Sequence, residues 1–435
     1  MIKTHLKQGI NLIKQNPLFS GFYILGTGLA ISMVMVLAVI YYIKVAEIYP
    51  ETNRWRMMVA KEVHMQNIED PSWNTTYNIG YNLLRDCFYG LENVEAVSGF
   101  SSDLVGEGSV KLPSGKHRVS VIQKAVDTAF WKVFEFSFIH GKPFSETDFT
   151  SGIRTVVISE ETARRVFQTS DVVGQYLTID FKDYKICGVV EAPSYATELS
   201  YAQVWMPYTC VPGYDQANQM GALGVYQVAI LAKSSDDFEN ITAQVDDFTR
   251  KFNAIPHEGY KLLLHGQPYA YWKSLFYIDS MTDLDFTKIF RKIGLILLML
   301  LLVPALNLSG MISSRMDKRL PEMGVRKAFG AAPWTLFSQI ISENLILTVL
   351  GGLLGLLISF GMVVVSKNWL LTLLDDKVTG LPDGVQMSIS AEMLFNPALF
   401  ILTFLICMVL NLFSALFPAY LALRKNIVYS LNKQK

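Results

Sequence analysis

The sequence is poor in charge. Asp, Glu, Lys and Arg make up only 17% of its 435 residues, whereas hydrophobic residues make up 51%. Because soluble domains carry about 25% charged residues, this shortfall indicates that part of the chain lies in lipid. Basic and acidic residues balance at 38 each, so the net charge gives no support for a nucleic-acid partner, and we expect none.

Cysteine is scarce as well. Cys87, Cys187 and Cys210 lie in the polar middle of the chain, and Cys407 lies in an apolar run. No Cys-x-x-Cys pair and no Cys/His spacing typical of zinc occurs, so we expect no metal site. Whether two of the first three cysteines form a disulfide is left open by the sequence.

Common catalytic motifs are also missing. The chain has no G-x-x-x-x-G-K-[ST] phosphate loop, no H-E-x-x-H and no G-x-S-x-G. It therefore cannot hydrolyse ATP through a phosphate loop, and we expect no catalytic residue and no cofactor bound by this chain. Its apolar runs hold no charged side chain, which argues against an ion-coupled pump.

The sequence does contain four long apolar runs. They are Ser20–Ile43, Ile293–Ile312, Asn344–Val365 and Pro397–Leu423, and each has the roughly 20 residues that span a bilayer. Lys and Arg gather before the first run, between the second and third, and after the fourth, whereas 366–396 is mainly acidic. Both termini and the connection between the second and third runs are therefore expected in the cytoplasm. The first run exceeds the apolar core of a signal peptide, so we interpret it as an uncleaved anchor.

The polar stretch 44–290 is then extracytoplasmic and reads as a mixed α/β domain. The runs 154–159 and 184–190 have strand composition, whereas 160–167 and 236–252 have helical spacing. We expect 130–222 to be a β-rich subdomain inserted into a βαβ-like parent. The predicted fold is thus a membrane protein with four transmembrane helices and a mixed α/β extracytoplasmic domain.

The cytoplasmic connection reads LPEMGVRKAFGAAPWTLF over 320–337. Arg319, Glu322 and Arg326 recur at helical spacing on one face, and Glu322 precedes Arg326 by four residues, the favourable order for an ion pair. Gly330 can end this helix in the left-handed conformation, and a proline follows three residues later. The segment therefore reads as a short amphipathic helix, either a plain surface helix or a docking site for a cytoplasmic protein.

The third apolar run holds a ridge of small residues. Gly351, Gly355 and Ser359 lie four residues apart, a spacing that allows another helix to approach closely. The partner helix is either in the same chain or in a second subunit. Glu343 lies at the cytoplasmic margin of this run and is either an interfacial residue or a polar contact between helices.

Two stretches resemble a known family. EMGVRKAFGAAPWTLFSQIISENLILTVLGGLLGLL (322–357) is similar to the signature of the FtsX/MacB/LolC-type ABC transporter permeases. Runs within 129–191, among them RTVVISEETARRVF and DVVGQYLTID, are similar in order and spacing to the extracytoplasmic domain of MacB-like proteins. The resemblance covers nearly the whole chain, but the fused ATPase domain of MacB is missing from it.

The resemblance implies a non-catalytic permease of the bacterial inner membrane. In this family two permeases, copies or paralogues, pair and work with a dimer of a separate ATPase, which uses ATP and Mg²⁺. ATP-driven motion is relayed to a porter-like outer domain (mechanotransmission) to export or extract a peptide, an antibiotic-like compound or a lipoprotein, and a periplasmic adaptor is a further expected partner. The alternative is an FtsX-like signal relay that controls an extracytoplasmic partner such as a cell-wall hydrolase.

Matching positions assign a coupling element that contacts the ATPase. Its residues are Arg319, Glu322, Met323, Gly324, Arg326, Lys327, Ala328, Phe329, Gly330 and Ala331. Two departures from the family pattern are Pro321, just before Glu322, and Asn426–Ile427, where Asp-Pro is expected.

The resulting boundaries cover the whole chain. We expect a cytoplasmic segment (1–19), a first transmembrane helix (20–43), the extracytoplasmic domain (44–290), a second transmembrane helix (291–313), the coupling region (314–333), a third transmembrane helix (334–365), an outer loop (366–396), a fourth transmembrane helix (397–423) and a cytoplasmic tail (424–435).

Overall fold

The chain divides into two compact units, which are described one at a time. The computed structural model describes residues 14, 17–111, 118–216, 221–255, 259–276, 285–296, 298–299, 325–326, 328–330, 332–372 and 397–424. The helical unit comprises Met1–Tyr42, Phe286–Asp375 and Ala391–Lys435, and the sheet unit comprises Ile43–Asp285 and Asp376–Ser390.

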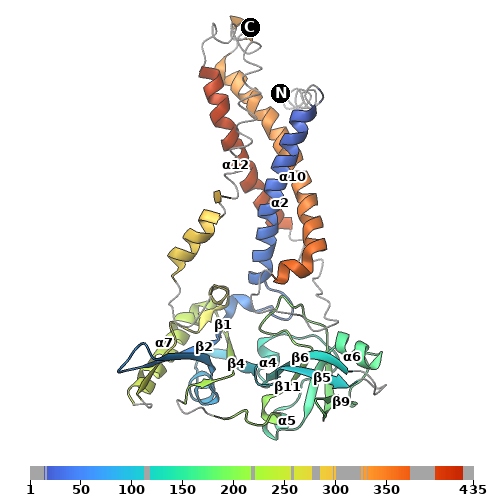
Figure 1. Ribbon diagram of the computed structural model, residues 1–435, viewed down its shortest axis with the longest axis vertical. Helices are drawn as coiled ribbons and strands as arrows, with labels where there is room; N and C mark the ends of the chain where they lie inside the picture. The colour runs from blue at the N-terminus through green and yellow to red at the C-terminus, as the bar shows by residue number, and fades with distance from the viewer. Residues whose placement is uncertain are drawn as a thin grey trace. The chain divides into compact units, whose positions relative to one another are not determined.

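The sheet unit is built around an 11-stranded sheet (Figure 1). Its strands are β1 (Met57–Ala60), β4 (Val94–Ser101), β5 (Glu107–Lys111), β6 (Arg118–Val126), β7 (Phe138–Gly141), β8 (Thr155–Ser159), β9 (Tyr176–Ile179), β10 (Lys182–Val190), β11 (Val204–Pro207), β13 (Gln227–Ala232) and β15 (Tyr269–Ala270). They follow the order β11-β8-β10-β9-β5-β6-β4-β13-β1-β15, with β7 beside β10. Mixed parallel and antiparallel pairing agrees with the predicted mixed α/β class.

Part of this sheet closes on itself. β11 pairs with β8 at one edge and also runs parallel to β6, so β11, β8, β10, β9, β5 and β6 form a ring, in which β5 and β9 meet at Val110 and Ile179. The ring encloses one hydrophobic core, and α6 (Glu160–Phe167) adds Ala163 and Val166 to it. The segment 130–222, expected to be an inserted subdomain, therefore shares its sheet and its core with β5 and β6, which precede it in the chain.

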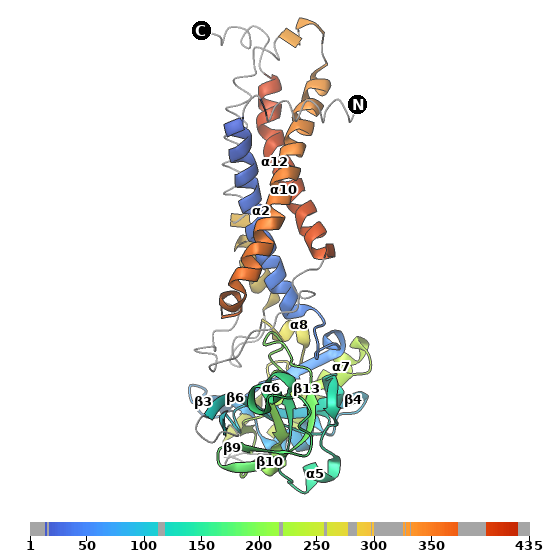
Figure 2. The ribbon, with the colours of Figure 1, turned by 90° about the vertical axis from the view of Figure 1, so that its right-hand side faces the viewer.

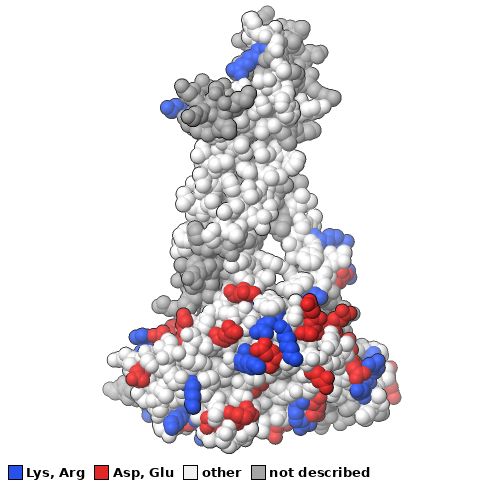
Figure 3. All heavy atoms as spheres, turned by 180° about the vertical axis from the view of Figure 1, so that it is seen from behind, with Lys and Arg blue, Asp and Glu red and all other residues white. Residues whose placement is uncertain are grey.

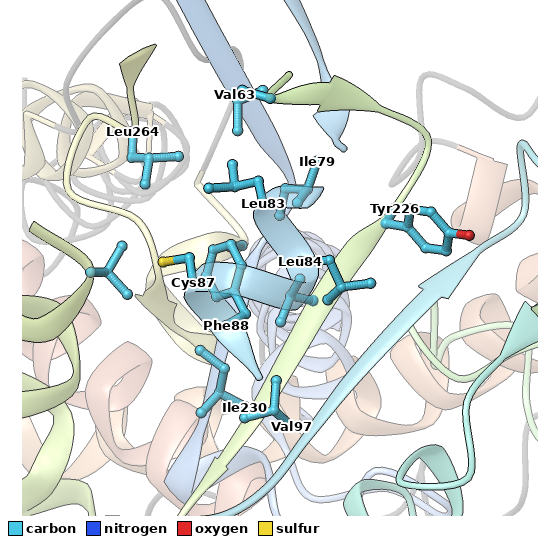
Figure 4. Close-up of a cluster of buried hydrophobic side chains, with 14 of the residues drawn as sticks. Val63, Ile79, Leu83, Leu84, Cys87, Phe88, Val97, Tyr226, Ile230 and Leu264 are labelled. Atoms are coloured by element: carbon cyan, nitrogen blue, oxygen red, sulfur yellow. The ribbon is translucent and has the colours of Figure 1, made fainter. Parts of the chain in front are cut away.

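A second, four-stranded sheet has the order β12-β3-β2-β14. Its strands are β2 (Glu62–Asn67), β3 (Asn74–Ile79), β12 (Leu223–Gly224) and β14 (Tyr260–Leu263). Between this sheet and the larger one lies a core into which α3 (Tyr81–Leu83) inserts Leu83 and the π-helical turn η2 (Leu84–Phe88) inserts Leu84 and Phe88 (Figure 4). The helical spacing of 236–252 is confirmed by α7 (Phe238–Asn253), whose Ile241 and Val245 are buried in the same core.

Short helices complete the sheet unit. They are η1 (Arg54–Arg56), α4 (Phe130–Val133), α5 (Glu146–Thr150), η3 (Tyr208–Cys210), η4 (Ser235–Asp237) and α8 (Tyr271–Ser274). The predicted helix 160–167 is confirmed by α6, and Ser159 is its N-cap, since the Ser159 hydroxyl accepts a hydrogen bond from the Thr162 N–H at 3.2 Å. Phe130 and Val133 of α4 share a third core with Trp205 of β11.

The helical unit contains α2 (Pro17–Val45), α10 (Pro333–Thr372) and α12 (Pro397–Arg424), which lie side by side (Figure 2). Two stretches of the described residues are long and apolar enough to cross a membrane, Pro17–Val45 and Phe337–Val365; α12 has a shorter apolar stretch, Phe400–Val409. In the face shown in Figure 3, charged side chains gather on the sheet unit, and the described surface of these helices is largely without charge. Most of the expected second span, 291–313, lies outside the described residues.

Candidate functional site

The segment just before α10 holds the described part of the predicted coupling element. Val325, Arg326 and Ala328 are helical, and the Phe329 N–H donates to the Val325 carbonyl at 3.0 Å. Gly330 follows with φ +85°, the left-handed conformation expected at a helix end. Phe329 is 88% exposed. The predicted residues that lie outside the described part are Arg319, Glu322, Met323, Gly324, Lys327 and Ala331.

Arg326 is tied to α10 through two hydrogen bonds in series. Its Nη1 donates to Gln339 Oε1 at 2.8 Å, and Gln339 Nε2 donates to Glu343 Oε1 at 3.0 Å. Gln339 and Glu343 are one helical turn apart on α10, and Glu343 is only 2% exposed. The bond from Gln339 lies within α10, so a polar contact of Glu343 with another helix stays a prediction. The arrangement gives Arg326 a fixed position relative to the buried carboxylate, and sequence reasoning missed Gln339.

The ridge of small residues on α10 faces α2 of the same chain. A Cβ placed on Gly351 would lie 2.8 Å from Thr27 Cβ, and one on Gly355 would lie 2.6 Å from the Gly28 carbonyl oxygen. Ser359 Oγ lies 3.7 Å from Met35 Sδ. These glycines are therefore required by the close approach of two backbones, and not by a left-handed φ.

Two further contacts fix α10. The hydroxyls of Tyr23 and Thr348 lie 3.2 Å apart and are buried between α2 and α10. On another side of α10, a Cβ on Gly352 would lie 2.0 Å from a ring carbon of Phe404 in α12. Because small residues and one polar pair occupy these contacts, the three helices pack closely as a group.

In the sheet unit, a buried ion pair binds the last turn of α2. Arg54 Nη2 lies 2.8 Å from Glu51 Oε2, and both side chains are at most 1% exposed. Arg54 Nη1 donates to the carbonyls of Ile43 at 3.0 Å and Ala46 at 2.5 Å, so it satisfies acceptors that a helix end leaves open. A cation near a helix C-terminus is also favoured by the helix dipole.

Glu51 makes the remaining contacts of this buried group, and Arg54, Glu51, Ser200 and Tyr271 are together called the junction below. Its Oε1 accepts from the Ser200 N–H at 3.0 Å and from the Ser200 hydroxyl at 2.9 Å, and its Oε2 accepts from the Tyr271 hydroxyl at 3.0 Å. The Arg54 guanidinium also lies over the Tyr271 ring, 4.7 Å from its centroid. One ion pair thereby joins the end of α2, the loop before β11 and α8. No sequence motif signals it, because the partners of Glu51 are 149 and 220 positions away.

Lys124 of β6 lies beside this junction. It is 3% exposed, and its Nζ donates to the carbonyls of Glu198 at 3.1 Å and Leu199 at 2.5 Å. Burial lowers the pKa of Lys124 to about 8, although the charges of Glu51 and Glu198 act in the opposite direction. The lysine thus holds the same loop that Ser200 anchors to Glu51.

The described residues offer no cluster of three or more His, Cys, Asp or Glu side chains that could hold a metal ion. The question left open for Cys87, Cys187 and Cys210 is answered, since each is a free thiol. Burial raises the pKa of Cys87 and of Cys187 to about 12, so neither thiol is a reactive thiolate near neutral pH.

Comparison with known families covers both units. Residues 20–248 match the family described as MacB-like periplasmic core domain, and residues 294–427 match the family described as FtsX-like permease C-terminal. The first match alone spans more than half of the 435 residues.

Individual relatives are distant. The chain is 21% identical over 272 residues to the uncharacterized ABC transporter permease YknZ of Bacillus subtilis (62% of this chain, 63% of that protein). It is 22% identical over 292 residues to the macrolide export ATP-binding/permease protein MacB of Marinobacter nauticus (66% of this chain, 41% of that protein). It is 25% identical over 236 residues to the pyoverdine export protein PvdT of Pseudomonas entomophila (54% and 34%). The chain thus covers less than two thirds of the length of each of these relatives.

Among solved structures, the extracellular domain of the YknZ transporter from Gram-positive bacteria matches 46% of this chain and 99% of its own, with 12% identity and a TM-score of 0.33. The family matches carry the assignment. The periplasmic core domain match covers most of α2 and of the sheet unit, and the permease match covers α10 and α12. The chain therefore belongs to the FtsX/MacB-like family of ABC transporter permeases.

Proposed function

We propose that this permease relays ATP-driven motion of a separate cytoplasmic ATPase to its extracytoplasmic sheet unit, and thereby exports or extracts a peptide, an antibiotic-like compound or a lipoprotein. The observation that carries the proposal is the bonded series Arg326–Gln339–Glu343. It joins the predicted ATPase-contacting segment to a buried carboxylate of an apolar helix. A displacement of Arg326 by the ATPase would therefore be transmitted to α10.

In this proposal the chain crosses the bacterial inner membrane four times. α2, the region around 291–313, α10 and α12 are the spans. The distribution of Lys and Arg in the sequence puts both termini and the 314–333 region in the cytoplasm, and the sheet unit outside. The permease works as a pair, either with a second copy or with a paralogue, and a periplasmic adaptor is a further partner.

Hydrolysis belongs to the partner. Because the sequence has no phosphate loop, ATP and Mg²⁺ would be bound by an ATPase dimer, and this chain would be a non-catalytic subunit. The exposed Phe329 and the coupling residues around Arg326 supply an apolar anchor and a positive charge for that contact. Such a pairing of an aromatic residue with an arginine is typical of the few residues that dominate binding energy at interfaces.

The relay continues by contact from helix to helix. α10 packs on α2 at Gly351 and Gly355, and α2 runs without interruption to Val45. Its last turn is held by Arg54, which Glu51 ties to the loop at Ser200 and to Tyr271. Rigid helices and buried bonded groups transmit displacement without dissipating it in flexible segments.

Co-purification tests the first step. The full chain, tagged and extracted from native membranes, is expected to retain an ABC ATPase, and the double variant Arg326→Glu/Lys327→Glu is expected to lose it. Lys14→Glu, a charge reversal at an exposed helical residue on the same predicted side, is the matched control and should retain the ATPase. If the double variant retains the ATPase as well as the wild type does, the coupling role is wrong.

A second measurement separates transport from an FtsX-like signal relay. The match to a MacB-like periplasmic core domain, together with the export functions named for MacB and PvdT, favours transport. ATPase activity of the reconstituted complex should then rise on addition of a small exported compound, peptide or lipoprotein. Stimulation by a soluble cell-wall hydrolase, and by none of these compounds, would instead identify a signal relay.

A further inference from the structure

A pocket in the sheet unit is lined by residues of the closed ring β11, β8, β10, β9, β5 and β6, and we call this part of the ring its mouth. The volume of the pocket is about 160 Å³, and among the residues that line it are Gln123 of β6, Lys182 and Tyr184 of β10, and Met206 of β11. All three strands belong to the ring, and Met206 and Tyr184 are part of its core. Mouths of closed β-sheets are frequent ligand sites, because the sheet supplies a rigid wall on every side.

Polar side chains occupy inward positions at this mouth. Side chains alternate between the two faces of a strand, so Gln123 shares the face of the core residue Val121, and Lys182 shares the face of Tyr184 and Ile186. The interior of a small ring is normally filled by apolar side chains. Lys182 is exposed at the start of β10, whereas the Gln123 amide is a polar group in an otherwise apolar row.

These polar groups have no hydrogen-bond partner among the described residues. Gln123 is 3% exposed and Tyr184 is 6% exposed, yet neither the Gln123 amide nor the Tyr184 hydroxyl makes a hydrogen bond there, and the Lys182 ammonium has no ion pair. Neither polar group is fully enclosed by protein, because both line the pocket, where solvent reaches them. A molecule in the pocket would therefore take the place of solvent as their hydrogen-bond partner.

Gly108 on β5 makes room for the amide. A Cβ at this position would lie 2.0 Å from Gln123 Nε2 and 3.0 Å from Ile179 Cγ2. Gly108 is not among the residues with positive φ, so its backbone does not demand glycine. What the glycine provides is space for the Gln123 side chain within the ring.

The donors at the mouth determine the class of ligand. The Lys182 ammonium, the Tyr184 hydroxyl and the Gln123 amide can all donate, and the first carries a positive charge. Asp180 also lines the pocket with a negative charge, and one of its oxygens accepts from the Ser109 N–H at 3.0 Å. A bound anion must therefore lie nearer to Lys182 than to Asp180. The rest of the wall is apolar and includes Ile179 and Val211.

We propose that the mouth of the ring binds a carboxylate carried on a short apolar stem. Lys182 and Tyr184 donate to the carboxylate oxygens, Gln123 completes the set of donors, and the apolar wall takes the stem. The volume is close to that of an engineered cavity of about 150 Å³ that holds benzene, so a stem of a few carbon atoms fits. A free short-chain acid and the C-terminal residue of a peptide both carry this group.

Ligand-observed NMR on the full chain in nanodiscs tests the site with four probes. They are butanoate, its neutral amide butanamide, N-acetylvaline and N-acetylvalinamide. We expect at least one carboxylate to bind about tenfold more tightly than its amide, because loss of one charge-assisted hydrogen bond is of this size. Binding of butanoate alone would identify a free acid as the source, and binding of N-acetylvaline would identify a peptide end.

Variants locate the binding. Lys182→Met should weaken carboxylate binding about tenfold, and Gly108→Ala should weaken it without removing any polar group. Lys185→Met is the matched control, since Lys185 is an exposed lysine of the same strand that faces away from the ring, and it should bind as the wild type does. Equal affinity for acid and amide, or equal weakening by Lys182→Met and Lys185→Met, would overturn the proposal. The result is independent of the proposed transport function.

Discussion

Arg54 and Glu51 form an ion pair at 2.8 Å that is shielded from solvent, and the same arginine caps the last turn of α2. A buried pair gains little over an apolar pair of similar size, but removal of one partner leaves an uncompensated charge in a dry environment. The pair is therefore a junction that tolerates joint replacement better than the loss of one member.

Replacing Arg54 alone should be costly. Arg54→Met leaves the Glu51 carboxylate buried without its cation and should lower the free energy of unfolding by about 3–5 kcal/mol. The double variant Glu51→Leu/Arg54→Met should recover part of this loss. Denaturant unfolding of the full chain in nanodiscs, followed by tryptophan fluorescence, measures both.

Arg56 provides the control for that series. It lies two residues away in η1 and forms an ion pair with Glu95, whose side chain is 36% exposed. Because a partly solvated pair is worth about 1 kcal/mol or less, Arg56→Met should be much milder. Equal losses for Arg54→Met and Arg56→Met would contradict the assignment of Arg54 as the junction.

Contact between α2 and α10 should depend on Gly355. Gly355→Ala places a methyl group 2.6 Å from the Gly28 carbonyl oxygen, so the helices must separate, at a cost of about 1–3 kcal/mol. Gly361→Ala, on the same helix, meets nothing within 4 Å and should leave stability unchanged or slightly raised. Thermal unfolding in a single detergent compares the two. An equal effect of both substitutions would show that the close approach is not needed.

Lys124 should make stability depend on pH. Its folded-state pKa of about 8 is below the ordinary value of 10.5, so its contribution to stability is complete above pH 10.5 and is lost as the pH falls through 8. Between pH 8 and pH 9.5 the free energy of unfolding of the wild type should rise by about 1.5 kcal/mol relative to that of Lys124→Met, because methionine does not titrate. Unfolding curves for both proteins at the two pH values give this difference. An equal change in the free energy of unfolding for the wild type and Lys124→Met would contradict the role of Lys124.

How far the sequence predicts this structure depends on the distance between interacting residues. α6 and α7 follow from local periodicity and caps, and the left-handed Gly330 follows from its place after a helical pattern. The ring of strands does not follow, because β5 and β6 pair with strands that come much later in the chain, and strand composition does not specify a partner.

The candidate site shows the same division. Arg326, Gly351 and Gly355 stand in patterns that indicate their roles, whereas Gln339 is an ordinary helix residue until its two hydrogen bonds are seen. Glu51 and Arg54 lie three residues apart in a segment without a recognisable motif, and their importance comes from Ser200 and Tyr271 far along the chain. Burial of such a pair is a tertiary property that no local signal records.

The most direct test of the account is the rate of ATP hydrolysis by the co-purified ATPase with the permease in nanodiscs. We predict that Arg326→Glu lowers permease-dependent ATPase stimulation about tenfold, because a charge-assisted contact of roughly 1.5–3 kcal/mol is lost, and that Lys14→Glu leaves it unchanged. Equal stimulation by the wild type, Arg326→Glu and Lys14→Glu would contradict the claim that the segment before α10 couples the ATPase to this permease.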